Sequence, residues 1–262
     1  MDLELRGKVA LVAASSRGLG RAIAEELARE GAAIVLCARG AGALEQARAA
    51  LAAAGAAATA VAGDLTRTDD VRRIAAAAQA AHGRVDVLVT NAGGPPPGPF
   101  ESHDEAAWLA AVRLTLLSVV ELIRAVLPGM KERGFGRILN VTSIAVKQPV
   151  DNLVLSNALR AAVTGMARTL ANETAPHGIT VNNLLPGYTN TERVQELSHA
   201  QAQAQGVRPE DVVAAWRAQI PAGRLGEPRE LAALAAFLAS PRAAYVTAQS
   251  IAVDGGWIRG LL

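Results

Sequence analysis

Cysteine and aromatic residues are scarce in this chain of 262 residues. It has one cysteine, Cys37, and aromatic residues make up 3% of the sequence. A single cysteine excludes an intramolecular disulfide, and its place in the apolar run AIVLCA predicts a small buried hydrophobe rather than a reactive thiolate. With so few aromatic side chains, we expect a core built mainly from Ala, Val, Leu and Ile.

Metal-ligand spacing, charge runs and targeting signals are also missing. The four histidines, His82, His103, His177 and His199, are too far apart in the sequence to suggest a metal site. Lys and Arg are scattered and the net charge is +2, so we expect no nucleic-acid partner. The start MDLELRGK is acidic where a signal peptide is basic, and we expect no apolar stretch of membrane-spanning length. These absences predict a cytoplasmic protein with no membrane partner.

Apolar runs of strand length alternate with Ala-rich stretches of helical period along the chain. Strands are expected at residues 8–14, 33–38, 58–63, 85–90, 136–142, 179–185 and 249–253. This alternation is typical of an α/β fold, in which helices cover both faces of a parallel sheet. No linker or break in composition interrupts it, so residues 1–262 are expected to form one domain.

The first expected strand runs into a turn of small residues, AASSRGLGRAIAEEL, at residues 13–27. A strand that enters a helix through Gly18 and Gly20 lets a pyrophosphate approach the backbone at the helix N-terminus, where free N–H groups favour anions. A purely structural turn is the alternative. The position of the glycines, after the first strand and before a helix, favours a dinucleotide site.

Several motifs together resemble the short-chain dehydrogenase/reductase family, close to its β-ketoacyl-carrier-protein reductase-like members. They are GKVALVAASSRGLGRAIA, NAGG, GRILNVTS, GITVNNLLPGYTNTERV, IPAGRLGEPRELAALAAFLAS and YVTAQSIAVDGGW, and they cover nearly the whole chain. The resemblance implies a doubly wound Rossmann-like three-layer sandwich with a seven-stranded parallel sheet of order 3-2-1-4-5-6-7. It also implies hydride transfer between a nicotinamide and a small carbonyl or alcohol substrate, and a homotetramer or dimer. Assembly would use the long helices that contain Thr115 and Ser156 and the segment IAVDGGW.

The resemblance assigns nucleotide contacts to many parts of the chain. In chain order they are Ala14, Ser15, Ser16, Arg17, Gly18, Leu19 and Gly20 at the turn, Arg39 after the second strand, Asp64 and Leu65 on the adenine side, Asn91, Ala92 and Gly93 after the fourth strand, Arg160, and Pro186, Gly187 and Thr191 beside the nicotinamide. Ala13 and Ala14 replace the Thr and the first Gly of the family's pattern. If position 14 needs a positive φ the alanine is strained, and if it needs only closeness to the nucleotide the methyl group crowds it.

The residue after the second strand bears on the choice of nucleotide. NAD-binding sites carry an acidic residue there, whereas this chain reads Ala38-Arg39. Together with Arg17, Arg39 could hold a 2′-phosphate through charge-assisted hydrogen bonds, and the alternative is an ordinary surface arginine. We therefore expect NADP (NADPH) as the cofactor, with NAD less favoured.

The catalytic positions depart from the family's tetrad of Asn, Ser, Tyr and Lys. The matching residues are Thr115, Ser143, Ser156 and Arg160, so three of the four are substituted. A serine hydroxyl is a far weaker acid than a phenol, and Arg160 stays protonated, so it can bind ribose or phosphate oxygens but cannot relay a proton. Ser156 and Arg160 are one helical turn apart, so both are expected to face the same site.

Two other side chains could supply the proton. Lys147 follows the fifth strand and would need desolvation to act as an acid or base, and Tyr188 lies next to Pro186-Gly187. Alternatively, Lys147 is solvated and Tyr188 only packs. A helical lid is expected at about 188–222, where Val213 and Trp216 either line an apolar cavity or form the lid's own packing face. The run GGPPPGPF predicts a stiff loop at the mouth of the site.

Three functions are compatible with these residues. The favoured one is an NADP(H)-dependent oxidoreductase with a non-standard proton donor, because hydride transfer depends mainly on how cofactor and substrate are held. The second is a catalytically silent nucleotide-binding protein. The third is a non-redox lyase or hydratase that uses Lys147 or Tyr188 as a base.

Overall fold

The computed structural model describes residues 1–261, and its centre is a seven-stranded parallel sheet of order β3-β2-β1-β4-β5-β6-β7. The strands are β1 (Val9–Ala13), β2 (Ala33–Ala38), β3 (Ala58–Ala62), β4 (Val87–Thr90), β5 (Gly136–Val141), β6 (Ile179–Pro186) and β7 (Ser250–Val253). The expected strands are all present, and their ends differ from the expected ones by at most two residues. The expected fold class and strand order are confirmed.

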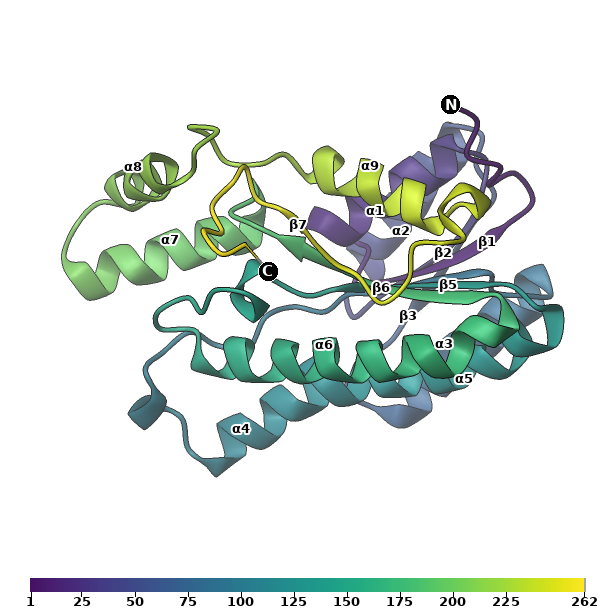
Figure 1. Cartoon of the computed structure of the whole chain (residues 1–262), viewed down its shortest axis with the longest axis horizontal. Helices are drawn as coiled ribbons and strands as arrows, with labels where there is room; N and C mark the ends of the chain where they lie inside the picture. Colours follow the sequence, from purple (N-terminus) through teal and green to yellow (C-terminus); the bar gives the residue numbers. More distant parts are fainter. Residues whose placement is uncertain (262) are drawn as a thin grey trace.

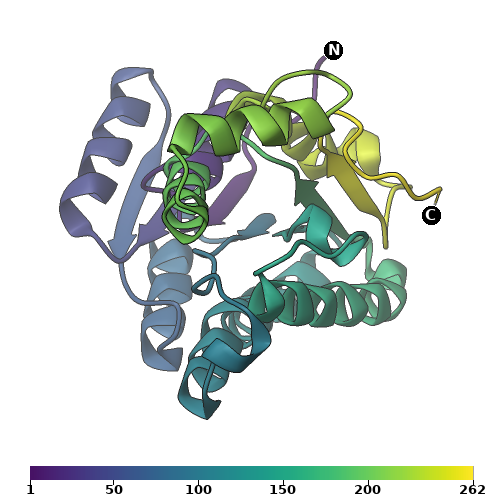
Figure 2. The ribbon, with the colours of Figure 1, turned by 90° about the vertical axis from the view of Figure 1, so that its left-hand side faces the viewer.

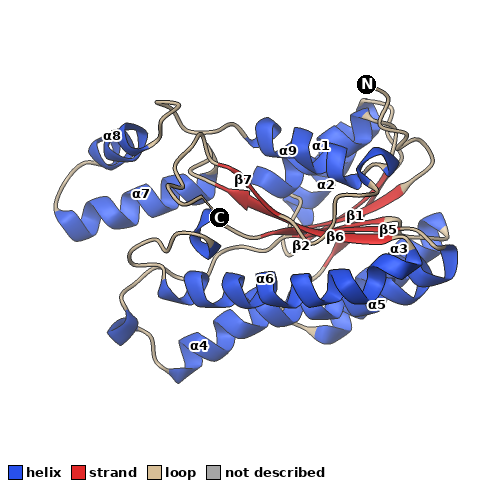
Figure 3. Ribbon diagram, viewed as in Figure 1, coloured by secondary structure: helices blue, strands red, loops and turns tan. Residues whose placement is uncertain are grey.

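Helices cover both faces of the sheet (Figures 1 and 3). On one face lie α1 (Gly18–Arg29), α2 (Ala41–Ala53) and α9 (Pro228–Ala239), and on the other α3 (Thr68–His82), α5 (Ser118–Arg133) and α6 (Val154–Thr174). Two further helices, α7 (Glu192–Gln205) and α8 (Pro209–Gln219), project past the carboxyl ends of the strands. Figure 2 looks onto these ends, with α7 and α8 in front.

The core lies on both sides of the sheet, which explains the unbroken apolar runs. In β1, Ala10 and Val12 pack beneath α1, α2 and α9, whereas Val9, Leu11 and Ala13 pack beneath α3, α5 and α6. A strand that is covered on both faces has no polar side to display, so its sequence does not alternate. Cys37 belongs to this interior as expected, and burial raises the pKa of its thiol to about 12.

We expected no apolar stretch of membrane-spanning length, and this expectation is wrong for one helix. The short helix α4 (Glu105–Val112) continues through a π-helical turn at Arg113–Leu117 into α5, and the continuous helix Glu105–Arg133 is long and apolar enough to cross a membrane. Length and composition alone are weak evidence, because core helices of α/β proteins pass the same test. Here the carboxyl-terminal half packs against the sheet through buried residues such as Leu122 and Met130.

Candidate active site

The glycine-rich turn after β1 is strained at Ala14. This residue has φ of 47°, a left-handed conformation that an L-alanine adopts at a cost of about 1–2 kcal/mol. Its carbonyl oxygen accepts a weak hydrogen bond from Asn91 Nδ2 at 3.4 Å, which ties the turn to the end of β4. Of the two effects considered for alanine at this position, backbone strain is therefore present.

We expect Ala14→Gly to raise the free energy of unfolding by roughly 0.5–1 kcal/mol, because removing the strain outweighs the added backbone entropy of the unfolded chain. Urea denaturation at equal protein concentration measures this gain. Ala54→Gly is the matched control, since Ala54 directly follows α2 with φ of −82° and has no such strain to relieve. An equal gain in both variants would contradict the strain argument.

The turn leads into the uncapped N-terminus of α1, where the backbone at Gly20 lies close to the backbone of Ala14. A Cβ on Gly20 would lie 2.5 Å from the carbonyl oxygen of Ala14 and 2.8 Å from Asn91 Nδ2, so only glycine fits. Helix α1 begins at Gly18, no side chain caps it, and its first turn contains no acidic residue. Its first N–H groups therefore remain available to an anion, and the turn fits a nucleotide pyrophosphate.

Ser15 joins the glycine-rich turn to β2. Its side chain is fully buried, and its hydroxyl donates to Val12 O at 2.8 Å and accepts from Cys37 N at 3.1 Å. Its own N–H also donates to Cys37 O at 3.1 Å, so the expected nucleotide contact of Ser15 stays a prediction. The neighbouring Ser16 and Leu19 are half-buried, and Arg17 is exposed.

The start of α7 lies against this turn from a distant part of the chain. Thr191 caps α7, its Oγ1 accepting from Val194 N at 3.4 Å, and its Cγ2 is 3.9 Å from where a Cβ on Gly18 would be. Arg17 Nε and Glu192 Oε2 are 3.6 Å apart. The expected pyrophosphate and nicotinamide residues thus lie together.

The remaining cofactor residues also lie at carboxyl ends of strands. Arg39 directly follows β2, is exposed, and forms no ion pair within residues 1–261. Asp64 follows β3, where its Oδ1 accepts from the N–H and hydroxyl of Thr66 at 2.9 and 2.8 Å, while Leu65 is buried. After β4, Asn91 and Ala92 are half-buried and Gly93 is exposed.

Pro186 ends β6 and Gly187 follows it beside the carboxyl end of β7. Gly187 N donates to Val253 O at 3.0 Å, and a Cβ on Gly187 would lie 2.7 Å from Asp254 Cα. Glycine is therefore required for this close approach, which carries the chain from β6 towards Tyr188 and Thr191.

Arg160 connects α6 to the end of β5. Its Nε donates to Ser156 Oγ at 3.2 Å, and its Nη1 donates to the carbonyl oxygens of Val141 at 2.9 Å and Thr142 at 2.8 Å. Burial, and then the nearby positive charge of Arg193, lower the pKa of Arg160 to about 10, so the guanidinium is still protonated at neutral pH. The one-turn spacing of Ser156 and Arg160 indeed places both side chains in one cluster.

Two serine hydroxyls in this cluster keep their protons free. Ser143 Oγ accepts from Ala145 N at 3.1 Å, and Ser156 Oγ accepts from Arg160 Nε. Because both of these donors can only donate, each serine can direct its own O–H towards a substrate oxygen. Thr115 lies in the π-helical turn, where its buried Oγ1 has no hydrogen-bond partner in the described chain.

The two alternative proton donors differ in their surroundings. Lys147 is exposed after a short helical turn, so it lacks the desolvation that an acid or base role requires. Tyr188 stacks on Trp216 with ring centroids 4.6 Å apart and meets the edge of Trp257 at 5.9 Å. Burial, and then the negative charge of Asp151, raise the pKa of Tyr188, which makes ionisation near neutral pH harder.

The aromatic contacts show which role Trp216 takes. Trp216 is buried against Tyr188, and Val213 packs against the same cluster, so these residues form a packing face of α7 and α8. The sequence analysis gave no role to Trp257 or Arg193, although both stand inside quoted motifs, because their contacts with Tyr188 and Pro95 come from distant parts of the chain.

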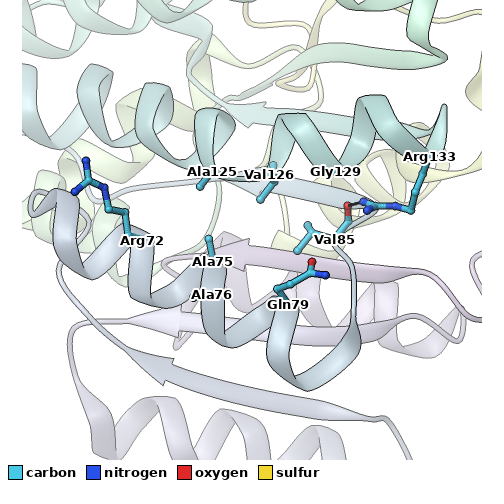
Figure 4. A pocket seen from close by; sticks show the side chains of 9 residues that line it. All are labelled: Arg72, Ala75, Ala76, Gln79, Val85, Ala125, Val126, Gly129 and Arg133. Atoms are coloured by element: carbon cyan, nitrogen blue, oxygen red, sulfur yellow. Dashed lines mark hydrogen bonds between the residues drawn. The ribbon is translucent and has the colours of Figure 1, made fainter.

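A groove of about 340 Å³ lies elsewhere, between α3 and α5 (Figure 4). It is lined by Arg72, Ala75, Ala76, Gln79, Val85, Ala125, Val126, Gly129 and Arg133. Val85 and Arg133 precede β4 and β5, so the groove reaches the amino ends of the strands. Ligands of doubly wound sheets bind beyond the carboxyl ends, and the groove is therefore separate from the candidate site.

Comparison with known proteins agrees with this geometry. Residues 13–258 match the family model described as enoyl-(acyl carrier protein) reductase. The 3-oxoacyl-(acyl-carrier-protein) reductase FabG of Vibrio cholerae is 36% identical over 254 residues, which cover 97% of this chain and 98% of that protein. The chain belongs to the short-chain dehydrogenase/reductase family. The resemblance of the motifs is thereby confirmed, and the chain is an oxidoreductase by family.

Solved structures of this family superimpose on nearly the whole chain. L-sorbose reductase of Gluconobacter frateurii, solved with NADPH and L-sorbose, has a TM-score of 0.94 and 32% identity, with 100% of each chain covered. A variant of actinorhodin polyketide ketoreductase, solved with NADPH, has a TM-score of 0.93 and 35% identity, covering 97% of this chain and 98% of that one. Both relatives are reductases of the short-chain dehydrogenase/reductase family.

Proposed function

We propose that this chain is an NADPH-dependent reductase that adds a hydride to the carbonyl group of a small molecule. The observation that carries the proposal is the uncapped N-terminus of α1 beside Gly20, with exposed Arg39 at the end of the neighbouring strand β2. The helix end suits a pyrophosphate, and Arg39 together with Arg17 suits a 2′-phosphate. The NADPH-bound relatives support the choice of nucleotide.

The residues at the carboxyl end of β5 would act on the substrate. When bound, the nicotinamide supplies the hydride. Ser143 and Ser156 direct their free O–H groups at the carbonyl oxygen, and the Arg160 charge behind Ser156 strengthens that donor. Negative charge that develops on the oxygen is thus stabilised by fixed donors, as in an oxyanion hole.

None of the residues at the family's tetrad positions can release a proton near neutral pH. The two serine hydroxyls are too weakly acidic, and Arg160 keeps its proton. Since Tyr188 is made less acidic by burial and Lys147 is exposed, water supplies the final proton in the proposed reaction. The same two observations weigh against a lyase or hydratase that relies on these side chains as a base.

Titration with NADPH and NADH tests the cofactor assignment. We expect NADPH to bind at least about 10-fold more tightly, and Arg39→Ala to weaken NADPH but not NADH by about the same factor, because a charge-assisted contact to the phosphate is lost. Nicotinamide fluorescence reports binding. Arg72→Ala, on exposed Arg72 of α3, is the charge-matched control. Failure to bind either nucleotide would rule out the redox function, and binding without turnover of any carbonyl compound would favour a silent nucleotide-binding protein.

We further propose that the chain forms a homodimer or homotetramer through the exposed side of the helix Glu105–Arg133. Leu109 and Leu117 on this helix are 53% and 45% exposed, and only a third of its most apolar stretch is buried. Large apolar side chains on one exposed helix favour burial against a second copy, and this surface includes the helix expected to mediate assembly. Tyr245, just before β7, is fully exposed and marks a second candidate contact.

A further inference from the structure

The loop that follows β4 is joined to three other segments at the carboxyl ends of the strands. At its start, Asn91 Nδ2 donates to Ala14 O at 3.4 Å, in the turn after β1. Further along, Gly98 N donates to Asn152 O at 2.7 Å, in the segment that leads into α6. Between these two contacts, Pro95 is buried and accepts a hydrogen bond from α7. The loop is therefore fixed on both sides of the point where α7 contacts it.

Arg193, in the first turn of α7, makes the contact with Pro95. Its Nη2 donates to Pro95 O at 2.8 Å, an ordinary hydrogen-bond length. Gly94 leaves room for the guanidinium, because a Cβ on Gly94 would lie 2.9 Å from Arg193 Nη2 and 3.1 Å from its Nε. Within residues 1–261, this is the only hydrogen bond that joins a side chain of α7 to another element. The hold of the loop on α7 therefore depends on Arg193.

The start of α7 also reaches the turn after β1. Glu192 Oε2 lies 3.6 Å from Arg17 Nε, and Thr191 Cγ2 lies 3.9 Å from where a Cβ on Gly18 would be. These contacts complete a ring that runs from the turn after β1 to the loop after β4, on to the start of α7 and back to the turn. Because Glu192 and Arg17 are both exposed, their ion pair contributes little to holding this ring together.

The remaining contacts of α7 and α8 lie at the two ends of this helical pair. Tyr188, which precedes α7, stacks on Trp216 with ring centroids 4.6 Å apart. At the end of α8, Gln219 O accepts a hydrogen bond from Arg259 Nη2 at 3.2 Å. Neither contact involves the loop after β4, so both can persist when Arg193 leaves Pro95. The pair can therefore move away from the loop while its attachment to the rest of the fold is kept.

We propose that the Arg193–Pro95 hydrogen bond holds α7 closed against the loop after β4, and that it opens each time NADPH enters or leaves. The inference rests on the proposed function, because each segment of the ring carries a residue expected to contact the nucleotide: Gly18, Asn91 and Thr191. A nucleotide that contacts all three segments is released only after one of them moves away. Since α7 projects past the sheet, it can move without disturbing a strand (Figure 1). Arg193 is thus a positioning residue that acts through the loop and α7.

Stopped-flow release of NADPH, followed by its fluorescence as excess NADP⁺ displaces it, tests the inference. We expect Arg193→Ala and Gly94→Ala each to raise the release rate by roughly 10-fold, as for the loss of one charge-assisted hydrogen bond. The association rate should rise as well, so that the Kd changes less than the release rate. The double variant should release NADPH no faster than Arg193→Ala alone, because both changes remove one contact.

Glu196→Gln is the matched control. Glu196 lies 3.6 Å from Arg193 Nη1, so this change removes the carboxylate beside Arg193 but keeps the donor to Pro95 O, and it should leave the release rate unchanged. Unchanged release in both alanine variants overturns the inference. So does faster release with an unchanged association rate, because that result means that Arg193 contacts the nucleotide itself.

Hydrogen exchange of the α7 amides in the nucleotide-free protein separates the inference from the proposed function. We expect faster exchange in α7 for Arg193→Ala and Gly94→Ala, with the strands unchanged, because the helix is released from the loop while the fold stays intact. Unchanged exchange in α7 overturns the inference. If the natural chain binds no NADPH, the proposed function is contradicted, and faster exchange in both variants still supports Arg193 as the residue that holds α7 to the loop.

Discussion

Restoring a phenol and an amine to the catalytic positions, by Ser156→Tyr with Arg160→Lys, is expected to raise the turnover of a neutral ketone by roughly 10²- to 10⁴-fold. General acid catalysis contributes a factor of this size, and a phenol whose pKa is lowered by an adjacent cation supplies the acid that two serines cannot. The positions suit this exchange because Ser156 and Arg160 are already in contact at the end of β5. The rate of NADPH oxidation at saturating ketone measures the gain.

The pH profile identifies the source of the gain. The double variant should show a new ionisation in kcat that the natural chain lacks, since only the variant carries a titrating phenol beside the substrate. Ser156→Phe with Arg160→Lys is the matched control, because it adds the ring without the hydroxyl and should not gain activity. If the tyrosine variant also fails to gain, the site has diverged at further positions, of which Thr115 is the first to restore to asparagine.

The second large effect concerns stability and lies at the opposite end of the sheet. Asp86, just before β4, is fully buried, and its carboxylate accepts from Val9 N at 3.0 Å and from Arg84 Nε and Nη2 at 2.8 and 2.6 Å. Arg133 Nε lies 3.7 Å away. Asp86→Ala would leave the Val9 N–H and Arg84 without their acceptor and Arg133 without its opposite charge. We expect it to lower the free energy of unfolding by about 3–5 kcal/mol.

Urea denaturation at one fixed protein concentration checks this value, because subunit association changes apparent stability. Asp69→Ala is the control: Asp69 is 89% exposed and lies 3.7 Å from Arg72, and such surface pairs contribute between 0 and about 1 kcal/mol. A loss below about 1 kcal/mol for Asp86→Ala would show that water or neighbouring groups replace the carboxylate.

The strands could be predicted because a strand buried on both faces has an unbroken run of apolar residues in the sequence. AIVLCA reads as a strand because four of its six side chains belong to one core cluster or the other with no exposure, and the same holds for most of β1. Local spacing also sufficed for the clustering of Ser156 with Arg160, because the two residues are one helical turn apart.

Features that depend on contacts between distant parts of the chain could not be predicted from the sequence. Ser15 stands in a nucleotide motif, yet its hydroxyl joins β1 to β2 through Cys37, which is 22 residues later. Arg193 is positioned by its hydrogen bond to the carbonyl oxygen of Pro95, which is 98 residues earlier, and no local sequence pattern predicts that contact. The π-helical turn at Thr115 likewise looks like ordinary helix in sequence. Charge balance at a site depends on three-dimensional proximity, and spacing along the chain does not report it.

The buried thiol of Cys37 also makes the native protein a convenient background for labelling. With a pKa near 12 and no exposed surface, this single sulfhydryl presents almost no thiolate to an alkylating reagent while the fold is intact. A cysteine introduced on the exposed surface of α8 would thus be the one reactive position, suited to a fluorophore that follows α7 and α8. In the unmodified chain, the slow rate of Cys37 alkylation would measure how often the central strands open by local unfolding.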